Sequence, residues 1–238
     1  MVGSAEAITN SQKVLSAQFH VIAHNLANVN TSGYKRILCD FINAPAVAGS
    51  QASPDAVTVK TVHDFSPGAL VQTERALDLG LQGKGFFVLE TPEGQLYTRH
   101  GVFTTNAEGR LVDLAGRAVA GESGPIVIPK NAPLRSINVS ADGNVSAGKA
   151  VLGKLRLVEF ADPQVLVAVG QNAFQGPPNL ATAAKTTTVH QGFQEASNVG
   201  VVDELVGLIM VSRLYEANLK AAHAQDERLK TLLQVAAG

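Results

Sequence analysis

The feature that most constrains this chain is an apolar stripe of helical spacing at each end of the sequence. In the N-terminal stripe, apolar residues recur at steps of seven, four and three, which places them on one narrow face of a helix, as in a coiled coil. Its members are Ile8, Leu15, Phe19, Ile22, Leu26 and Val29. The C-terminal stripe contains Val201, Leu205, Leu208, Tyr215, Leu219, Ala222, Leu229 and Leu233. Apolar helical faces at both ends favour an assembly protein over an isolated catalytic domain.

The two stripes predict two long helices. The first runs from residue 5 to residue 29 and ends at a polar run, where Gly33 can adopt the positive φ found after helix C-termini. The second begins near Val201, with Asn198 as a candidate N-cap and acidic residues in its first turn. Its length of about 35 residues corresponds to about 50 Å. We expect such long helices to pair with each other and with other copies.

Between the helices, the period of the sequence changes to that of short strands. Val57, Val59 and Thr61 alternate with polar residues, as in a half-buried strand. Further strand-like runs recur between turn signals, at residues 86–89, 96–99, 102–104, 110–112, 126–128, 137–139 and 152–160. Many short strands with Gly-rich turns predict an all-β domain, either a sandwich or an irregular barrel. Residues 43–54 predict a flexible connector, and residues 170–190 are expected to be irregular.

The expected fold class is therefore α+β, with long N- and C-terminal helices pairing as a coiled-coil-like core domain around a central all-β domain. Residues 1–45 are expected to hold the N-terminal helix and turn of the core assembly domain, and residues 46–75 an extended connector. Residues 76–189 are expected to form a β-rich outer domain, and residues 190–238 the C-terminal helix of the core assembly domain.

Charge and composition exclude several classes of function. The formal net charge of −1 lacks the basic excess of a nucleic-acid-binding protein. No apolar run approaches the roughly 20 residues of a membrane span, so membrane insertion is not expected. Polar residues between Glu6 and Lys13 interrupt any signal-peptide core, so a cleaved signal is not expected either. The single Cys39 excludes an internal disulfide and is expected to be a small buried or half-buried thiol.

The sequence offers no convincing catalytic, cofactor or metal site. Residues 83–85, Gly-Lys-Gly, lack the ending of a phosphate-binding loop and predict a tight turn between strands. His20 and His24 would share a helix face, but the sequence supplies no third metal ligand. A peptidoglycan-cutting enzyme needs paired carboxylates, and the candidates are Asp142, Glu159, Asp162 and Glu195. We predict a protein that is not an enzyme, with no cofactor, metal or small-molecule substrate.

The polar run at residues 25–35 supports two interpretations, which we combine. It is a capped helix end followed by a turn, and it can also contact neighbouring subunits, where satisfied polar groups fix one register between helical seams. We select Asn28 and Asn30 for polar contacts, Gly33 for turn geometry and Tyr34 for interface packing. The rest of the candidate assembly interface comes from the stripes: Leu15, Phe19, Ile22, Leu26, Leu205, Leu208, Tyr215, Leu219 and Leu229.

Several blocks of the sequence resemble the bacterial flagellar rod and hook proteins. They are Asn25-Leu26-Ala27-Asn28-Val29-Asn30-Thr31-Ser32-Gly33-Tyr34-Lys35, followed by residues 82–88, 97–103, 191–199 and 215–218. Together the blocks span most of the chain, in the family's order. The resemblance implies that the terminal helices form an inner tubular core with a β-rich domain outside. It also implies export by the flagellar type III apparatus without a cleaved signal.

Within that family, the length and block order are most similar to the proximal rod protein, and the distal rod protein is next. Ser32 stands where the family usually has Pro, His24 where Asn or a small residue is common, and the segment before Ser11 diverges from the usual Gly-rich opening. The resemblance implies a structural subunit of the basal-body rod, spanning the periplasm, with other rod proteins and copies of itself as partners. The alternatives are a distal rod or hook-junction subunit, and a cell-wall binding module or hydrolase.

Overall fold

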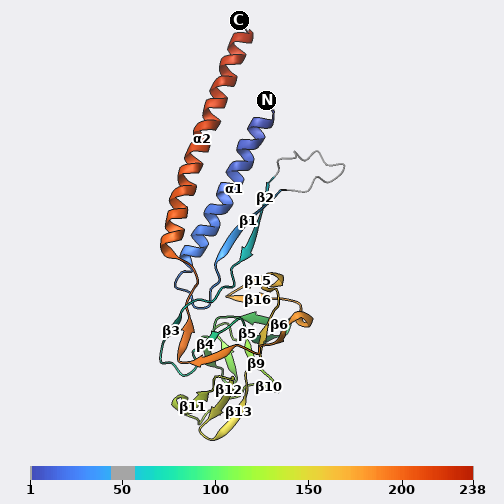
Figure 1. Cartoon of the computed structure of the whole chain (residues 1–238), viewed down its shortest axis with the longest axis vertical. Helices are drawn as coiled ribbons and strands as arrows, with labels where there is room; N and C mark the ends of the chain where they lie inside the picture. Colours follow the sequence, from blue (N-terminus) through green and yellow to red (C-terminus); the bar gives the residue numbers. More distant parts are fainter. Residues whose placement is uncertain (1, 44–56, 238) are drawn as a thin grey trace. The chain divides into compact units, whose positions relative to one another are not determined.

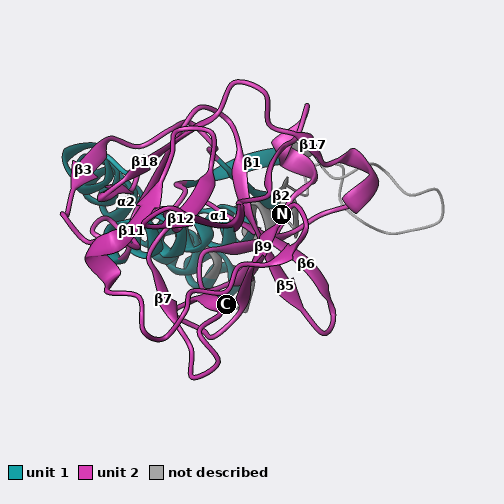
Figure 2. Ribbon diagram, turned by 90° about the horizontal axis from the view of Figure 1, so that it is seen from below, with its two compact units in different colours: residues 1–27, 37–63, 199–238 teal, residues 28–36, 64–198 magenta. Residues whose placement is uncertain are grey.

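The computed structural model describes residues 2–43 and 57–237. The chain divides into two compact units, which Figure 2 colours separately. Unit 1 consists of residues 1–27, 37–63 and 199–238, and unit 2 consists of residues 28–36 and 64–198. Each unit combines segments that are distant in sequence, so neither unit corresponds to one contiguous piece of the chain.

Unit 1 contains two long antiparallel helices and a β-hairpin (Figure 1). Helix α1 spans Val2–Ala27, and helix α2 spans Val201–Ala237. Strands β1 (Ile37–Asn43) and β2 (Val57–His63) pair in an antiparallel ladder, in register from Ile37↔His63 to Asn43↔Val57. Two long terminal helices are therefore confirmed, and the first one ends at Ala27 rather than at residue 29.

Helix α2 starts at Val201, as predicted. The amide of Glu204 donates a hydrogen bond of 3.0 Å to the carbonyl of Gly200, which closes the first turn. Asp203 and Glu204 both lie in that turn, where the helix dipole favours negative charge, as expected. The side-chain oxygen of Asn198, the predicted cap, accepts a hydrogen bond from the amide of Arg36. With 37 residues, α2 is about 55 Å long at 1.5 Å per residue.

The segment expected as an extended connector, residues 46–75, contains two strands, β2 and β3 (Leu70–Gln72). Strand β2 is the one predicted from the alternation at Val57, Val59 and Thr61, whereas its partner β1 has no counterpart among the predicted elements. Residues 44–56, which carry most of the predicted flexible connector, lie outside the described residues.

Unit 2 is built from short antiparallel strands and is the predicted β-rich domain. The strands after β3 are β4 (Leu79–Gln82), β5 (Phe86–Thr91), β6 (Gly94–Thr98), β7 (Phe103–Thr105), β8 (Leu111–Asp113), β9 (Ala118–Gly121), β10 (Gly124–Pro125), β11 (Ile137–Val139), β12 (Asn144–Ala147), β13 (Ala150–Lys154), β14 (Leu157–Glu159), β15 (Val167–Gly170), β16 (Ala173–Gln175), β17 (Thr182–Ala183), β18 (Thr188–Gln191) and β19 (Phe193–Glu195). The largest sheet has the order β15-β16-β6-β5-β9-β8-β7, with β10, β14 and β17 attached to it. Smaller sheets have the orders β11-β12-β13, β18-β4 and β19-β3.

Strand β5 separates the two hydrophobic cores of unit 2. Successive side chains of a strand point to opposite faces, so a strand covered on both faces is apolar at every position. Phe87 and Leu89 belong to one core, where the ring of Phe87 meets that of Phe103 edge to face at 5.0 Å between centroids. Phe86 and Val88 belong to the other core. This arrangement explains the uninterrupted apolar run in β5.

One predicted strand, at residues 126–128, is not formed. Pro125 and Pro129 flank this run, and proline has no amide hydrogen to donate to a ladder. Val127 makes an isolated bridge with Arg110, while the neighbouring isoleucines point into the larger core. Ile126 and Ile128 are buried and Val127 is 45% exposed, so the side chains alternate as in a strand, but the pairing is limited to one bridge.

The extent of the β-rich unit also differs from the expected domain at residues 76–189. Unit 2 additionally includes residues 28–36, 64–75 and 190–198. Residues 170–190 are not irregular throughout, since they contain β16, β17 and most of β18. The polar run after α1 and the segment before α2 thus belong to the β-rich unit and not to the helical one.

Candidate functional site

Helices α1 and α2 contact each other in unit 1, through residues that include positions outside the predicted C-terminal stripe. Leu15 on α1 and Val211 on α2 are each 7% exposed. A Cβ atom placed on Gly207 of α2 would lie 3.4 Å from Cδ1 of Ile22, so the missing side chain at Gly207 lets the helices approach closely. Ile22, Leu26 and Leu208, which belong to the predicted interface, are half-buried.

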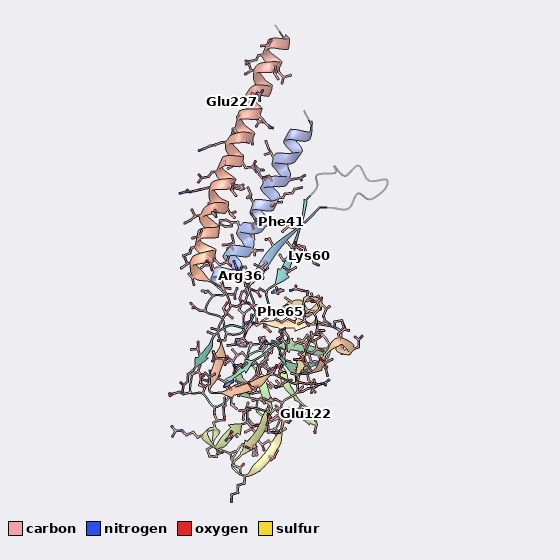
Figure 3. The ribbon with its side chains drawn as sticks, in the orientation of Figure 1. Arg36, Phe41, Lys60, Phe65, Glu122 and Glu227 are labelled. Atoms are coloured by element: carbon pink, nitrogen blue, oxygen red, sulfur yellow. The ribbon has the colours of Figure 1, made fainter. Side chains whose placement is uncertain are left out.

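Other members of the predicted interface are exposed. Phe19 is 44% exposed and Tyr215 is 41% exposed, and Leu205 and Leu219 are also classed among the exposed apolar residues. The side chain of Leu229 lies outside the described residues. Figure 3 draws the side chains along both helices. Further exposed apolar residues on α2 are Val201, Val202, Val206, Ile209, Met210, Leu214, Leu232, Leu233 and Val235. Exposed apolar surface of this extent is typical of interaction sites, whereas single exposed apolar residues are not.

A groove of about 320 Å³ lies between α1 and α2. We call it the helix groove. Leu15 and Phe19 line it from α1, and Val211 and Tyr215 line it from α2. Its remaining lining residues are Ser16, Ser212 and Glu216. The groove is therefore mainly apolar, and its polar groups can fix the orientation of a bound side chain or ligand.

Asn25 joins three elements of unit 1, although the sequence analysis did not select it as an interface residue. It is 1% exposed. Its amide nitrogen donates to the carbonyl of Ile37 at 2.8 Å, and its side-chain oxygen accepts from the amide of Ile37 at 2.9 Å. The same nitrogen donates to Oε1 of Glu204 at 3.1 Å. Asn25 thereby connects the first residue of β1 to both helices. In the sequence it stands out only as a polar residue between the apolar positions of α1.

The turn after α1 has the positive φ expected at Gly33, which is +67°. A Cβ atom at this position would lie 2.6 Å from Cα of His100 in unit 2. The amide of Gly33 donates to the carbonyl of Glu195 at 2.7 Å. Glycine is therefore required both for the backbone conformation and for the close approach of two chain segments.

Asn28, Asn30 and Tyr34, the other residues selected from the polar run, differ in their burial and contacts. The carbonyl and the side-chain oxygen of Asn28 accept hydrogen bonds from the amide and the hydroxyl of Thr31, at 3.0 and 3.3 Å. Asn30 is exposed, and Tyr34 is only 6% exposed. Tyr34 thus packs inside its own chain, and the contact of Asn30 with a neighbouring subunit stays a prediction.

A buried ionic cluster follows directly after this turn. Nζ of Lys35 lies 2.6 Å from Oε1 of Glu195, and both side chains are fully buried. The guanidinium of Arg99, which is also buried, lies 3.4 Å from Oε2 of the same carboxylate. Burial lowers the pKa of Lys35 from its ordinary value, while the charge of Glu195 acts in the opposite direction. One carboxylate therefore neutralises two cations only in part.

Backbone groups and an aromatic ring complete the cluster. Lys35 donates to the carbonyl of Ser66 at 2.7 Å, and the amide of Gly68 donates to Oε1 of Glu195 at 2.9 Å. Arg99 donates to the carbonyl of Gly83, and its guanidinium carbon lies 5.3 Å from the centroid of the Phe86 ring. Buried charges are tolerated when hydrogen bonds satisfy their remaining atoms, and these contacts do so in part, since Nε of Arg99 is buried without a hydrogen-bond partner among the described residues.

The segment before α2 is bound to the polar run at further points. Asn198 accepts from the amide of Arg36 at 2.7 Å and donates to the carbonyl of Asp64 at 2.8 Å. The hydroxyl of Ser32 donates to the side-chain oxygen of Gln194 at 2.5 Å. Residues 28–36 and 193–198 thus form one hydrogen-bonded junction within unit 2. Both segments overlap sequence blocks that resemble the family, but nothing in the sequence predicts that they bind each other.

Two of the four candidate catalytic carboxylates, those of Glu195 and Asp162, have structural partners. Glu195 is held in the ionic cluster, and Asp162 accepts from the amide of Gln164 at 2.9 Å, capping a short 3₁₀ helix. In residues 2–43 and 57–237, no three His, Cys, Asp or Glu side chains come together as a metal site would require. Cys39 is half-buried, as expected, and burial raises the pKa of its thiol. Across the same residues, no helix has the length and apolar character of a membrane span.

Known families match three separate parts of the chain. The family described as flagella basal body rod protein matches residues 10–35, and the flagellar hook protein FlgE/F/G D1 domain matches residues 80–147. The flagellar basal body rod FlgEFG protein C-terminal family matches residues 190–235. The first and third matches contain the two halves of the junction described above.

Individual relatives match along nearly the whole chain. The flagellar basal-body rod protein FlgG of Bacillus subtilis is 31% identical, over 95% of this chain and 96% of its own length. The flagellar basal-body rod protein FlgF of Caulobacter vibrioides is 34% identical, over 88% of this chain and 87% of its own length. FlgG of Buchnera aphidicola subsp. Schizaphis graminum is 33% identical, over 91% of this chain and 93% of its own length.

Proposed function

This chain belongs to the flagellar basal-body rod protein family, and we propose that, as a structural subunit of the rod, it polymerises through its terminal helices into the drive shaft that transmits torque to the hook. The observation that carries the mechanism is the series of exposed apolar side chains along α2. Burying one Leu, Ile or Phe side chain contributes roughly 1.5–3 kcal/mol. Several such contacts per subunit, repeated around a tube, give the assembly its resistance to torque.

The geometry of assembly follows from the two helices. We propose that α1 and α2 pair as a coiled-coil-like core within one subunit and that the exposed part of their surface packs on neighbouring subunits. A contact between two different surfaces of identical subunits does not close on itself unless its rotation forms a ring, so it propagates as a helical tube. The β-rich unit then forms the outer part of the subunit.

We further propose that the flagellar type III apparatus exports the chain without a cleaved signal and that the rod it joins spans the periplasm. Its partners in this proposal are copies of itself and other rod proteins. The position within the rod is proposed to be the proximal segment, in line with the length and block order of the sequence. The distal rod and the hook junction are the alternatives, and similar relatives carry both the FlgF and the FlgG name.

Deletion of the gene tests the proposed function directly. Basal bodies isolated from the deletion strain should show a truncated or missing rod, without a hook, and the cells should not swim. The point of truncation gives the position of the subunit, since a proximal subunit leaves a shorter rod than a distal one. Intact rods and normal swimming in the deletion strain would overturn the proposal.

A cell-wall hydrolase is the runner-up, and we propose instead that the chain is not catalytic. A general acid or nucleophile must reach its substrate, whereas Glu195 is fully buried and paired with two cations. Asp162 serves as the cap of a 3₁₀ helix. Purified full-length protein should therefore release no soluble fragments from peptidoglycan. Muralytic activity that follows the protein through purification would favour the hydrolase.

A further inference from the structure

Unit 2 contains a second cavity, a polar pocket of about 470 Å³. We call it the β-unit pocket. It is lined by the turn between β9 and β10, the start of β12 with the turn before it, the end of β13, β14, β17 and the residues that lead into β18. The pocket shares no lining residue with the helix groove. Its volume is within the range of small-ligand sites, which is roughly 300–1,000 Å³.

Backbone hydrogen bonds hold the walls of the β-unit pocket in place. The amide of Leu155 donates to the carbonyl of Gly143 at 2.8 Å, and the amide of Glu122 donates to the carbonyl of Lys154 at 2.8 Å. Strand β12 pairs with β13, and β14 pairs with β17. Because these segments are already tied together, a ligand would need to order little of the chain, which favours binding.

The Gly-Lys-Gly segment at residues 83–85, which the sequence singled out, supports one wall of the pocket. Oγ1 of Thr187, a lining residue, accepts a hydrogen bond of 2.9 Å from the amide of Gly85. A Cβ atom placed on Gly85 would lie 2.7 Å from the same oxygen. The absence of a side chain at Gly85 therefore lets the segment before β18 approach closely, and Thr187 is only 8% exposed.

Charged groups of both signs line the β-unit pocket. Glu122, which is labelled in Figure 3, pairs with Lys154 at 2.8 Å, so these two charges neutralise each other. Asp142 and Lys185 also line the pocket, and both are exposed. Within the part of the chain that the structure describes, neither of these two side chains is in an ion pair. One carboxylate and one ammonium group thus line the same cavity without pairing with each other.

The rest of the lining is mainly apolar. Leu155 belongs to the larger core and Leu157 packs against it, so both side chains are held in position. Ala183 and Ala184 contribute only methyl groups, which leaves room for the side chains of a ligand. Asn144 adds a side-chain amide, which can both donate and accept hydrogen bonds. The lining therefore suits a small aliphatic ligand with polar groups at its ends.

We propose that the β-unit pocket binds a short zwitterionic peptide with small aliphatic side chains, whose ammonium group faces Asp142 and whose carboxylate faces Lys185. A ligand with a single charge would leave one of the two protein charges without a partner, whereas a zwitterion complements both. The volume exceeds the space that one small amino acid fills, so the ligand is a peptide and not a free amino acid. Such binding is independent of assembly through the terminal helices.

Calorimetric titration of the purified full-length chain with trialanine tests the site. Saturable binding is expected. N-acetyl-trialanine lacks the ammonium group and trialanine amide lacks the carboxylate, so each should bind about fivefold more weakly than trialanine. Free alanine should also bind more weakly, because it cannot span the pocket. No saturable binding of trialanine, or equal affinity for trialanine and both capped peptides, would overturn the proposal. Alanine that binds as tightly as trialanine would overturn the choice of a peptide.

Two variants of the chain assign each end of the peptide to its partner. In Asp142→Asn, acetylation of the peptide should no longer weaken binding, because the partner of the ammonium group is gone. In Lys185→Gln, amidation should no longer weaken binding. Both positions are exposed, so both variants should keep the circular dichroism spectrum of the wild type.

Glu93→Gln is the matched control, since Glu93 is an exposed carboxylate of unit 2 that does not line the pocket. It should leave the affinities for trialanine and for both capped peptides unchanged. If the Asp142 and Lys185 variants distinguish the capped peptides as the wild type does, the peptide does not contact these residues and the proposal fails. An equal loss of affinity in the Glu93 variant would show that only the net charge of the chain matters, and would overturn it as well.

Discussion

Lys35 and Glu195 lie 160 positions apart in the sequence and form an ion pair of 2.6 Å in which both side chains are fully buried. The pair joins the polar run after α1 to the segment before α2. Two further contacts hold the same segments together, from Gly33 to the carbonyl of Glu195 and from Ser32 to Gln194. Residues near opposite ends of the chain thus form one junction inside the β-rich unit, and both segments are parts of the family's matched regions.

Neutralising Glu195 should strongly destabilise unit 2. Glu195→Gln leaves Lys35 and Arg99 buried without a counter-charge, and breaking a buried ion pair from one side typically costs about 3–5 kcal/mol. Urea unfolding of the full-length chain, followed by a probe of β structure, measures the loss. A chain as stable as the wild type would show that the buried cations find other compensation.

Glu122 provides the control for that measurement. It pairs with Lys154 at 2.8 Å, but the two side chains are 53% and 41% exposed. Solvent screens such a pair, and exposed ion pairs contribute about 0–1 kcal/mol. Glu122→Gln should therefore shift the unfolding midpoint little, although it removes the same charge. A similar shift in both variants would mean that burial does not determine how much the ionic cluster contributes to the free energy of unfolding.

Alanine at Gly33 should cost more than alanine at another glycine with positive φ. A left-handed conformation alone costs a residue with a Cβ atom about 1–2 kcal/mol. At Gly33 the new Cβ atom would also meet the backbone of His100 at 2.6 Å, whereas at Gly116, with φ +82°, nothing lies within 4 Å. Gly116→Ala should therefore show only the conformational cost, and Gly33→Ala should show that cost plus a steric term. Equal losses of unfolding free energy would contradict the close approach.

The sequence was sufficient to predict the helices and the β-rich unit, because both produce a periodic pattern of apolar residues. The stripes of α1 and α2 repeat with helical spacing, and the run at 86–89 marks β5 through burial on both faces. The junction left no such signal. Lys35 and Glu195 are ordinary charged residues in sequence, and their pairing depends on where the folded chain brings distant segments. No periodic pattern encodes a contact over 160 positions.

The sequence predicted only part of the candidate site, because helical spacing alone does not show which side chains are buried. Spacing identified Leu15 as a buried position, but it could not tell which members of a broad apolar stripe face the other helix and which stay exposed, as Phe19 and Leu219 do. Asn25 was missed as an interface residue because a single polar residue in a helix usually points to solvent. Only the structure places its side chain between Ile37 and Glu204.

Acidification should weaken unit 2 through His100. Burial is the main cause that lowers the pKa of His100 in the folded chain, below its ordinary value of 6.5. The unfolded chain therefore binds a proton at higher pH than the folded chain does. The free energy of unfolding should fall as the pH drops below 6.5 and level off once the folded chain is also protonated.

Two histidine variants check this pH dependence. His100→Asn should reduce the loss of unfolding free energy between neutral pH and mildly acidic pH. His20→Asn removes a histidine from the exposed surface of α1 and should leave the same profile close to that of the wild type. Unfolding free energies at a series of pH values give the comparison. If the His100 variant keeps the full slope, another group is responsible for it.

An aspartate at Leu219 should abolish assembly without unfolding the chain. Leu219 is 36% exposed in the single subunit, so a charge there remains in contact with water before assembly. In the proposed assembly the same position becomes buried against a neighbour, where an unpaired carboxylate is strongly disfavoured. Leu208→Asp should block assembly as well, but Leu208 is already half-buried in unit 1 and its replacement should also loosen the helices.

Leu134→Asp is the control, since Leu134 is 53% exposed in unit 2 and should tolerate the charge with normal motility. Swimming assays and imaging of basal bodies measure assembly, and circular dichroism of the purified chains measures folding. Normal motility of the Leu219 and Leu208 variants would contradict assembly through α2.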